Sequence, residues 1–508
     1  MTGYLVTPLQ MKKAEQLCEA NGVSTSKLME TAGEKIAEGI NSLTALEGKK
    51  IYILCGGGNN GGDGYAVAKS LLTYSAAADV IAFESPKTDI AADCLERCKP
   101  YFASYTLCKD ENADAIADAL SSADIIVDCI FGTGFHGEIE NENIVRLITA
   151  ANNSQALRFS ADVPSGCNAE NGEGSAHSFK ADYTFALGAL KCGHIHIPCS
   201  ELSGELVLLD IGIPDFCYEE YAAVITDDSV YKKLPKRNRI SNKGDYGRLL
   251  NIAGSENFIG AAWLSTNAAL RIGTGLVTLC SVQTVTSAVS ASLYESTYLH
   301  LEDSGHITTN HINDVLSAAE HATAVLIGCG TGCNEDIAKI TLSLIKYAGC
   351  PVVVDADGIN SLVPHINEIK DNNGMVVLTP HLKEFSRLSG CDMGYILKNK
   401  LDAAKIFARE YNVHLLLKDA YSVYAAPDGF TQINMSGNAA LAKAGSGDTL
   451  AGTIAGLMAG GMEVNDAVIA GAYLFGKAAE YEAKTRDMCG IMPSELPNSY
   501  AYILKNHR

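Results

Sequence analysis

The chain has 508 residues and a formal net charge of −20, and both numbers exclude classes of protein. A typical domain has about 100–200 residues, so the chain holds two or more domains and is no small disulfide-stapled scaffold. Nucleic-acid phosphates are held by clustered lysine and arginine, so the negative charge argues against a nucleic-acid partner. With 47% hydrophobic residues, 19% charged residues and 47 glycines, the composition is typical of a soluble α/β enzyme.

The first residues and the cysteines predict a cytoplasmic protein. The start, MTGYLVTPLQ, lacks a basic segment followed by an apolar one, and no apolar run approaches the roughly 20 residues of a membrane span. The 16 cysteines are scattered without zinc-site spacing, which predicts reduced, mostly buried thiols and no structural metal. We expect small-molecule ligands and a homo-oligomer, with neither a membrane nor a nucleic acid as partner.

Short β-rich runs alternate with helix-like segments in the first part of the chain. This alternation predicts parallel strands joined by crossover helices. The expected strands lie in residues 51–55, 78–84, 123–132, 157–166 and 181–188. Ahead of them, residues 11–40 have the apolar spacing of a helix.

The alternation lapses near residues 212–243 and then resumes, which predicts a second α/β domain. We place one domain at residues 1–215, a linker at 216–240 and the other domain at 241–508. A basic cluster from Lys232 to Arg239 fits a solvated linker better than a phosphate site. The second series of expected strands lies in residues 248–255, 275–282, 324–330, 351–358, 375–381 and 413–420, with a hairpin at 421–430.

A glycine-rich loop, GGGNNGGDG, follows the first expected strand and contains G-x-G-x-x-G from Gly56 to Gly61. Such loops carry ligands beyond the carboxyl ends of parallel strands, where helix N-termini offer free N–H groups. In a dehydrogenase, Glu84 after the second strand would hold the ribose. Against that hypothesis, Asn59, Asn60 and Asp63 crowd the loop with side-chain oxygens, and Asp63 would stand close to a pyrophosphate.

Later strand ends add further polar groups at the same predicted edge. They are Asp128, the segment GTGFHGE at 132–138 and the segment SADVPSG at 160–166. Amide and carboxylate oxygens with a serine suit a hard cation or a general base. Asp128 by itself fits a capping carboxylate equally well.

These motifs, with LMETAG upstream and FALGALKCG downstream, resemble the NAD(P)HX epimerase domain across about residues 1–215. The resemblance implies a Rossmann-like domain that interconverts the R and S forms of NADH or NADPH hydrated at C6 of the nicotinamide. It implies Asp162 as the acid/base residue and a potassium ion on Asn60, Asp128 and Ser165. The implied substrate contacts are Asn59, Asn60, Gly61, Gly62, Asp63, Gly132, Thr133, Gly134, Phe135, His136, Gly137, Glu138 and Asp162.

A second glycine loop, AGSGD at residues 444–448, comes directly before a long helix of small and apolar residues. Free N–H groups at that N-terminus suit the charge on a transferred phosphoryl group. An aspartate in the first turn, here Asp448, can take the proton of an attacking hydroxyl. The alternative is that Asp448 only caps the helix.

The loop resembles the anion hole and base of ribokinase-like kinases, and its surroundings resemble NAD(P)HX dehydratases across about residues 225–508. The supporting motifs are the segment 242–279, VLIGCGTG, VVVDADGIN, VVLTPHLKEFSRL and LLLKDAYSVYAAPDGF. The resemblance implies that ADP or ATP phosphorylates the added hydroxyl of the S form, that phosphate then leaves, and that magnesium accompanies the phosphates. Together the two resemblances predict two three-layer αβα domains, the first Rossmann-like and the second ribokinase-like.

The second resemblance also implies residue roles. Asp448 would be the base, and Ala262, Gly330 and His381 would contact the hydrated dinucleotide. The implied nucleotide site comprises Lys418, Asp419, Ala420, Tyr421, Ser422, Asn438, Ala444, Gly445, Ser446 and Gly447. His381 taken alone would fit a structural histidine, and Asp355 with Asp357 would fit either a metal site or a strand-end turn.

Three positions depart from the dehydratase pattern. Cys329 replaces a usual proline, Leu382 and Lys383 replace Pro-Gly, and Asp419 replaces a glycine. The last change is expected to put a carboxylate near the phosphates. Two other functions stay open at this point: a dehydrogenase fused to a sugar or vitamin kinase, and a catalytically silent dinucleotide sensor.

Overall fold

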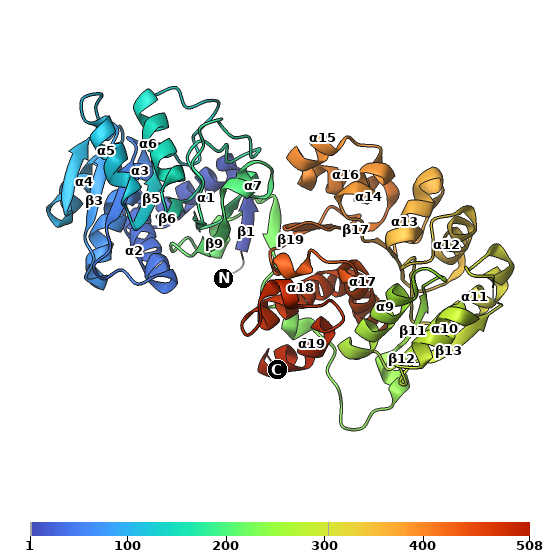
Figure 1. Cartoon of the computed structure of the whole chain (residues 1–508). Helices are drawn as coiled ribbons and strands as arrows, with labels where there is room; N and C mark the ends of the chain where they lie inside the picture. The colour runs from blue at the N-terminus through green and yellow to red at the C-terminus, as the bar shows by residue number, and fades with distance from the viewer. Residues whose placement is uncertain (1–2, 303, 508) are drawn as a thin grey trace. The chain divides into compact units, whose positions relative to one another are not determined.

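The computed structural model describes residues 3–302 and 304–507, and the chain divides into two compact α/β units between Val224 and Ile225 (Figure 1). The division falls within residues 216–240, the expected linker. This segment also contains strand β10 (Ala223–Ile225) and the short helix α8 (Val230–Lys233).

The first unit contains a seven-stranded parallel sheet in the order β4-β3-β2-β5-β6-β7-β9. Its first six positions follow the strand order of a doubly wound dinucleotide-binding fold, so this unit is Rossmann-like. The strands are β2 (Ile51–Cys55), β3 (Ala78–Ala82), β4 (Ser104–Leu107), β5 (Ile125–Cys129), β6 (Leu157–Ala161), β7 (Tyr183–Leu187) and β9 (Glu205–Leu209). A short strand β1 (Gly3–Val6) pairs in parallel with β8 (Leu190–Lys191).

Helices cover both faces of this sheet because its strand residues alternate between two apolar cores. On β2, Ile53 packs in the core formed with α1 to α4, whereas Leu54 packs in the core formed with α5 and α6. These helices are α1 (Pro8–Ala20), α2 (Thr25–Leu43), α3 (Asn59–Ser70), α4 (Asp89–Cys98), α5 (Ala113–Ser121) and α6 (Glu142–Asn153), followed by the short α7 (Cys199–Leu202).

The expected helix at residues 11–40 is two helices, α1 and α2. The chain turns between them at Gly22, whose φ of 94° lies in the left-handed region that glycine tolerates. The side chain of Ser24 then accepts a hydrogen bond from Lys27 N and caps α2. The apolar spacing predicted the helical content but not this break.

The second unit contains seven parallel strands followed by an antiparallel hairpin, in the order β13-β12-β11-β14-β15-β16-β17-β18-β19. The strands are β11 (Arg248–Ile252), β12 (Leu276–Val282), β13 (Thr297–Leu301), β14 (Ala324–Ile327), β15 (Val352–Val354), β16 (Val376–Leu378), β17 (His414–Leu417), β18 (Ser422–Ala425) and β19 (Thr431–Asn434). All six expected strands and the expected hairpin are therefore present.

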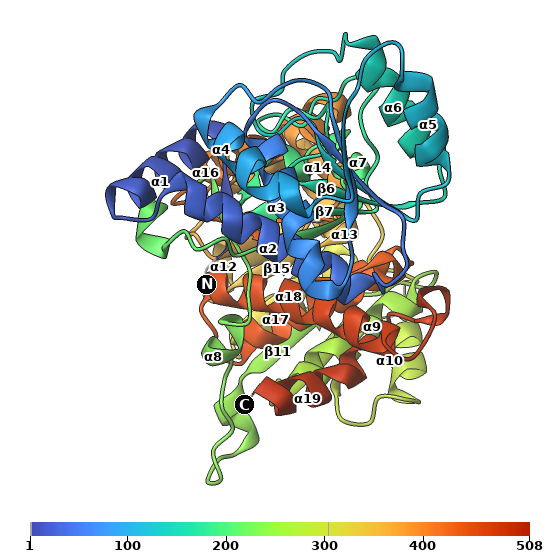
Figure 2. The ribbon, with the colours of Figure 1, turned by 90° about the vertical axis from the view of Figure 1, so that its left-hand side faces the viewer.

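Helix α17 (Ser446–Ala459) lies against α9 (Ile259–Ile272) and α18 (Val464–Ala483) in this unit (Figure 2). A Cβ at Gly452 of α17 would lie 2.1 Å from Ser265 O of α9, so the glycine permits the close approach of the two helices. The other helices are α10 (Gln283–Ser290), α11 (Ile312–Ala319), α12 (Glu335–Tyr347), α13 (Ala356–Leu362), α14 (Leu382–Ser389), α15 (Met393–Lys398), α16 (Lys400–Tyr411) and α19 (Leu496–His507).

Twelve of the sixteen cysteines are buried, which confirms the expectation of mostly buried thiols. Among the helices of the described residues, none combines the length and the apolar character needed to cross a membrane.

Candidate active sites

Asp162 follows β6 directly and has an uncommon backbone conformation. Its φ is 65°, a left-handed value that costs a non-glycine residue of order 1–3 kcal/mol and persists only where the surroundings fix it. Two hydrogen bonds fix it here: Asp162 N donates to Phe185 O (2.8 Å), and Asp162 O accepts from His194 Nε2 (2.8 Å). The carboxylate is thereby held at the carboxyl end of the sheet.

Lys191 forms a buried ion pair with this carboxylate. Its side chain is 1% exposed, and Nζ donates to Asp162 Oδ1 as well as to Leu187 O (2.9 Å) and Ala189 O (3.0 Å). The three donors of the ammonium group are all used, so Lys191 has one position. Lys191 lies within the motif FALGALKCG, but the motif alone did not predict a role for it. The available signal was a lysine within an apolar run.

Two further titratable groups lie around this ion pair, the buried His194 and the half-buried Asp63. His194 Nδ1 accepts from Lys191 N (3.0 Å), so Nε2 carries the hydrogen, and burial lowers the pKa of His194 to about 4. Burial raises the pKa of Asp63 well above its usual value, and the negative charge of Asp162 raises it further. The charges of Asp63 and Asp162 therefore influence each other, whereas the neutral His194 only holds the backbone of Asp162 in place.

The glycine-rich loop brings the N-terminus of α3 against the sheet. A Cβ at Gly61 would lie 2.0 Å from Gly56 O, and one at Gly62 would lie 2.5 Å from Met29 Cε. No side chain caps α3, so the N–H groups of its first turn face the open edge of the sheet. Asn59 Oδ1 accepts from Thr88 Oγ1 (2.7 Å). The glycines thus allow close packing, and the backbone N–H groups at the N-terminus of α3 are suited to bind a ligand.

Asn60 and Ser165 both bond to the backbone of Phe131, and Ser165 in turn bonds to Asp128. Asn60 Nδ2 donates to Phe131 O (2.9 Å), and Phe131 N donates to Ser165 Oγ (2.8 Å). The buried carboxylate of Asp128 accepts four hydrogen bonds, from Ser165 Oγ (2.5 Å), Ser165 N (2.7 Å), Ser160 Oγ (3.1 Å) and Ile130 N (3.2 Å). Burial nevertheless raises the pKa of Asp128 to about 6.

The segment 132–138 forms a loop beside this group. The ring of Phe135 lies 5.0 Å from that of Phe131, whereas Gly134, His136, Gly137 and Glu138 are exposed. The carboxylate of Glu138 accepts from Ser175 Oγ (2.6 Å) and Ala176 N (3.0 Å). Glu138 therefore binds a neighbouring loop of its own unit, and within the segment Gly132 lies beside Asn60, whose Cβ would be 3.2 Å from a Cβ at Gly132.

In the second unit, Asp448 lies in the first turn of α17 and does not cap the helix. The N-cap residue is Gly445, with φ of 93°, and no side chain accepts from the first turn. Ser446 Oγ is buried without a hydrogen-bond partner among the described residues. An uncapped helix N-terminus with a spare hydroxyl is suited to bind an anion.

Asp448 shares its surroundings with Cys329 and Asp355. One ligand atom from each of the three lies within 4.8 Å of the others. Lys418 Nζ lies 2.8 Å from Asp355 Oδ1, and a Cβ at Gly447 would lie 3.3 Å from Lys418 Nζ. Burial, and then the charge of Asp355, raises the pKa of Asp448 to about 6, which suits a general base working near neutral pH.

His381 lies beside Lys418 and has a structural role as well. Lys418 N donates to Pro380 O (2.8 Å), and His381 Nδ1 accepts from Lys383 N (3.1 Å) and Glu384 N (3.2 Å), which caps α14. Burial, and then Lys418, lowers the pKa of His381. The His381 side chain is half-exposed, and its Nε2 lies 3.5 Å from Glu384 Oε1.

The two other expected dinucleotide contacts are Ala262, in the first turn of α9, and Gly330, which packs against Phe258 at the N-cap of α9. A Cβ at Gly330 would lie 2.7 Å from Phe258 Cβ. Ala262 is fully buried, so its side chain serves the packing of α9 against Gly254. Gly330 lies in the turn that follows β14, and its close packing against Phe258 fixes its position there.

Asp419 is neutralised by a lysine that the sequence analysis did not assign. Lys400, 2% exposed on α16, places Nζ 2.6 Å from Asp419 Oδ2. Ser422 Oγ accepts from Asp419 N (3.2 Å) and donates to Asp419 O (2.9 Å), which closes the turn at 419–422. The carboxylate expected to face phosphates therefore enters an internal ion pair. Asn438 Oδ1 likewise bonds locally, to Ala440 N (3.0 Å).

Comparisons with known proteins match both units. Residues 249–500 match the NAD(P)H-hydrate dehydratase family, and residues 25–193 match the YjeF-related protein N-terminus. The bifunctional NAD(P)H-hydrate repair enzyme Nnr of Thermofilum pendens is 32% identical over 95% of this chain and 92% of its own. The enzyme of the same name from Moorella thermoacetica is 33% identical over 99% of this chain and 97% of its own.

Solved structures resemble the second unit. A ribokinase-like superfamily protein of Enterococcus faecalis matches 56% of this chain and 95% of its own with a TM-score of 0.50 and 22% identity, which supports a ribokinase-like fold. An ADP/ATP-dependent NAD(P)H-hydrate dehydratase of Bacillus subtilis, co-crystallised with ATP and Mg²⁺, matches 56% of this chain and 98% of its own, with 29% identity and a TM-score of 0.49.

Proposed function

The chain belongs to the family of bifunctional NAD(P)H-hydrate repair enzymes, and from this premise we propose how its two units divide the work. The first unit interconverts the R and S forms of NADHX and NADPHX around Asp162. The second unit dehydrates the S form to NADH or NADPH with ADP or ATP. The observation that carries the second assignment is Asp448 in the first turn of an uncapped helix, beside Lys418.

In the first unit, Asp162 moves the proton of the substrate's ring hydroxyl. Lys191 occupies Oδ1, so Oδ2 is the oxygen that faces substrate. The hydrated carbon carries both the hydroxyl and the ring nitrogen; when the hydroxyl loses its proton, the bond from carbon to nitrogen breaks and a carbonyl forms. Reclosure on the other face of the carbonyl returns the proton and inverts the centre. The loop 132–138 and the first turn of α3 hold the dinucleotide.

In the second unit, Asp448 takes the hydroxyl proton while the hydroxyl oxygen attacks the terminal phosphorus of the nucleotide, and the bond from that phosphorus to its bridging oxygen breaks, which releases AMP from ADP or ADP from ATP. The first-turn N–H groups of α17 and Ser446 Oγ face the charge that develops on the transferred group. Phosphate then leaves as the bond from C6 to oxygen breaks, the ring nitrogen supplies electrons, and loss of a proton from C5 restores the double bond. Asp448 is thus needed only until the phosphoryl group has moved.

Two cations accompany this account. Asp355 and Asp357 at the strand end would hold magnesium together with the phosphates, and the ion would supply charge neutralisation during transfer. Potassium fits the oxygen-rich group of Asn60, Asp128 and Ser165, and it must displace at least one of the four hydrogen bonds on Asp128. We further propose a homo-oligomer in a reducing compartment, which the sixteen free thiols suit.

A phosphate balance tests the proposal against a small-molecule kinase. Pure S-NADHX is incubated with the full chain and either ADP or ATP, and NADH absorbance and orthophosphate are followed together. The expected result is one orthophosphate for each NADH formed. A phosphorylated product that accumulates without NADH would identify a kinase instead, and no reaction with either nucleotide would refute the dehydratase assignment.

A further inference from the structure

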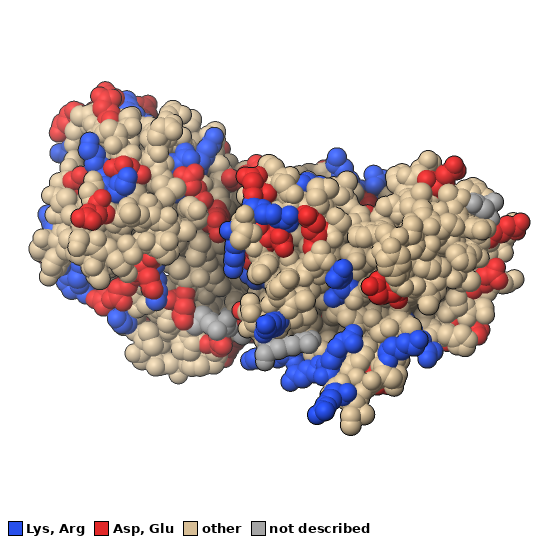
Figure 3. All heavy atoms as spheres, turned by 60° about the horizontal axis from the view of Figure 1, so that its bottom comes forward, with Lys and Arg blue, Asp and Glu red and all other residues tan. Residues whose placement is uncertain are grey.

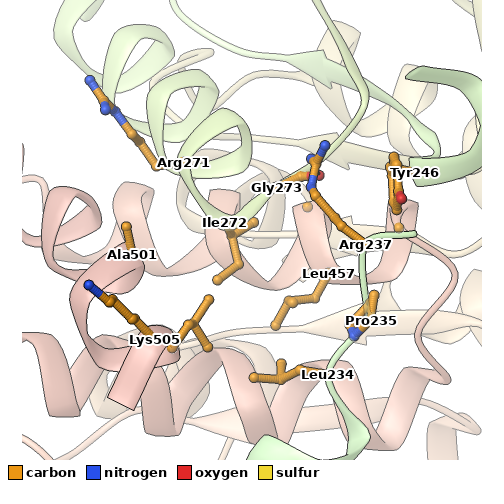
Figure 4. Close-up of a pocket in the computed structure, with 13 residues that line it drawn as sticks. Leu234, Pro235, Arg237, Tyr246, Arg271, Ile272, Gly273, Leu457, Ala501 and Lys505 are labelled. Carbon is orange, nitrogen blue, oxygen red and sulfur yellow. The ribbon is translucent and has the colours of Figure 1, made fainter. Parts of the chain in front are cut away.

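A cavity of about 320 Å³ lies within the second unit, at the opposite end of α17 from Asp448 (Figure 4). The side chains of Leu234, Ile272, Leu457 and Leu504 line its apolar part. Leu234 comes from the segment after α8, Ile272 ends α9, Leu457 lies near the end of α17, and Leu504 lies on α19. A cavity of this size with an apolar lining is typical of a small-molecule site.

Three cations stand around the apolar part: Arg237, Arg271 and Lys505. Within the described part of the chain, none of them has a carboxylate partner at ion-pair distance, and no acidic residue lines the cavity. The space-filling view in Figure 3 shows further Lys and Arg side chains on the protruding loop that Figure 1 draws in green. In a chain with a net charge of −20, such unpaired cations form a local site for an anion.

The basic segment is a built wall of the cavity and not a free linker. Arg237 Cζ lies 4.3 Å from the centre of the Tyr246 ring, and Arg237 Nη2 donates to Gly273 O (2.6 Å). Tyr246 Oη accepts from Asn238 N (2.8 Å) and donates to Ser241 Oγ (2.8 Å). The charge of Arg237 is therefore bound by the carbonyl at the end of α9, since a helix C-terminus attracts a cation.

Among residues 3–302 and 304–507, no such partner is found for Arg271 on α9 or for Lys505 on α19. In Figure 4 both residues lie on one side of the apolar side chains, with Ala501 between them and Pro235 on the other side, and both exposed charged ends point outward from the apolar part. This arrangement separates a cationic rim from an apolar interior. An amphipathic ligand with one anionic end matches both parts.

We propose that this cavity binds a small amphipathic anion, an alkyl chain of medium length with a carboxylate or phosphate head. The alkyl chain fills the space among Leu234, Ile272 and Leu457, and the head lies between Arg271 and Lys505. Asp448 and the cavity residue Leu457 lie nine residues apart on α17, about 13 Å along the helix axis at 1.5 Å per residue, so the site is distinct from the nucleotide site at Asp448. The proposal stands independently of the repair reaction.

Titration calorimetry on the full chain tests this with octanoate and octyl phosphate as probes and octan-1-ol as the uncharged control. We expect one bound anion per chain, binding that weakens as salt is raised, and much weaker binding of the alcohol. Binding of octanoate alone or octyl phosphate alone supports the site and identifies its head group. Absence of binding by both anions, or equal binding of the alcohol, would overturn the proposal.

Two variants locate the binding. The double change Arg271→Gln with Lys505→Gln removes the cations and should weaken binding about tenfold or more. Ala501→Trp, at the exposed edge of the cavity between Arg271 and Lys505, obstructs the place of the head group and should abolish binding without touching a charge. Lys484→Gln, an exposed lysine elsewhere in the second unit, is the matched control and should bind as wild type. Unchanged binding in Ala501→Trp, with dehydratase activity showing a folded protein, would place the anion elsewhere and refute the site.

Discussion

Lys400 Nζ lies 2.6 Å from Asp419 Oδ2, and the lysine side chain is only 2% exposed. A charge buried to this degree depends on its partner. Asp419→Ala is therefore expected to destabilise the second unit by about 3–5 kcal/mol, since Lys400 is left buried and unpaired. Lys400→Met combined with Asp419→Ala should recover most of that loss. The measurement is the thermal unfolding midpoint of the full chain and of both variants.

The pair Lys370–Glu410, with side chains 38% and 50% exposed, provides the control for this comparison. Lys370→Met is expected to change stability by less than about 1 kcal/mol, because exposed ion pairs contribute little. An Asp419→Ala variant as stable as Lys370→Met would show that the Lys400 pair is not a structural requirement.

Gly452 determines how closely α17 approaches α9. Alanine normally stabilises a helix interior by up to about 1 kcal/mol relative to glycine, but here its Cβ would lie 2.1 Å from Ser265 O. Gly452→Ala should therefore destabilise the protein, by about 1–3 kcal/mol for an overpacked contact. Gly260→Ala on α9 meets no atom within 4 Å and should be neutral or stabilising. Denaturant unfolding of the two variants decides the sign, and a stabilising Gly452→Ala would contradict the packing.

The raised pKa of Asp448 predicts the acid limb of the dehydratase reaction. A base must be ionised, so with a pKa of about 6 the rate should fall roughly tenfold per pH unit below 6 and level off above it. Orthophosphate release from S-NADHX measures the profile. Asp355→Asn removes a negative charge that raises this pKa, and the limb should move to lower pH. If the acid limb of Asp355→Asn lies at the same pH as that of wild type, the limb does not report the ionisation of Asp448.

The group around Asp128 predicts a preference among monovalent cations. If potassium binds there, it stabilises the folded state by mass action, about 2.7 kcal/mol at a hundred times its Kd. Wild-type protein should therefore unfold at a higher temperature in KCl than in NaCl of equal concentration, and Asp128→Asn should abolish the difference. Identical midpoints for wild type in the two salts would remove potassium from the account.

The sequence predicted the buried strands well because parallel strands covered on both faces are continuous apolar runs. Besides the short strands β1, β8 and β10, the sequence missed β4, β9 and β13, which lie at the ends of their strand orders. Their residues are mostly half-exposed, so they lack the apolar run that identifies a strand. Edge position, which the chain order does not reveal, was the missing information.

The site residues also divide into those that a local sequence pattern predicted and those that it did not. Asp448 and the loop 56–64 were predictable because their chemistry lies within a short motif at a strand or helix end. Lys191 and Lys400 were not, because each pairs with a carboxylate 29 or 19 positions away. Such pairs depend on which helices and strands the fold brings together.

The central claim is that two separate aspartates, Asp162 and Asp448, serve the two halves of one repair reaction. Mixed epimers of NADHX are supplied with ADP or ATP, and the return of NADH absorbance is followed for wild type, Asp162→Asn and Asp448→Asn. Wild type should restore both epimers, Asp448→Asn neither, and Asp162→Asn the S fraction quickly while the R fraction waits for slow spontaneous epimerisation. Fast and complete recovery by Asp162→Asn, or recovery of any fraction by Asp448→Asn at the wild-type rate, would contradict it.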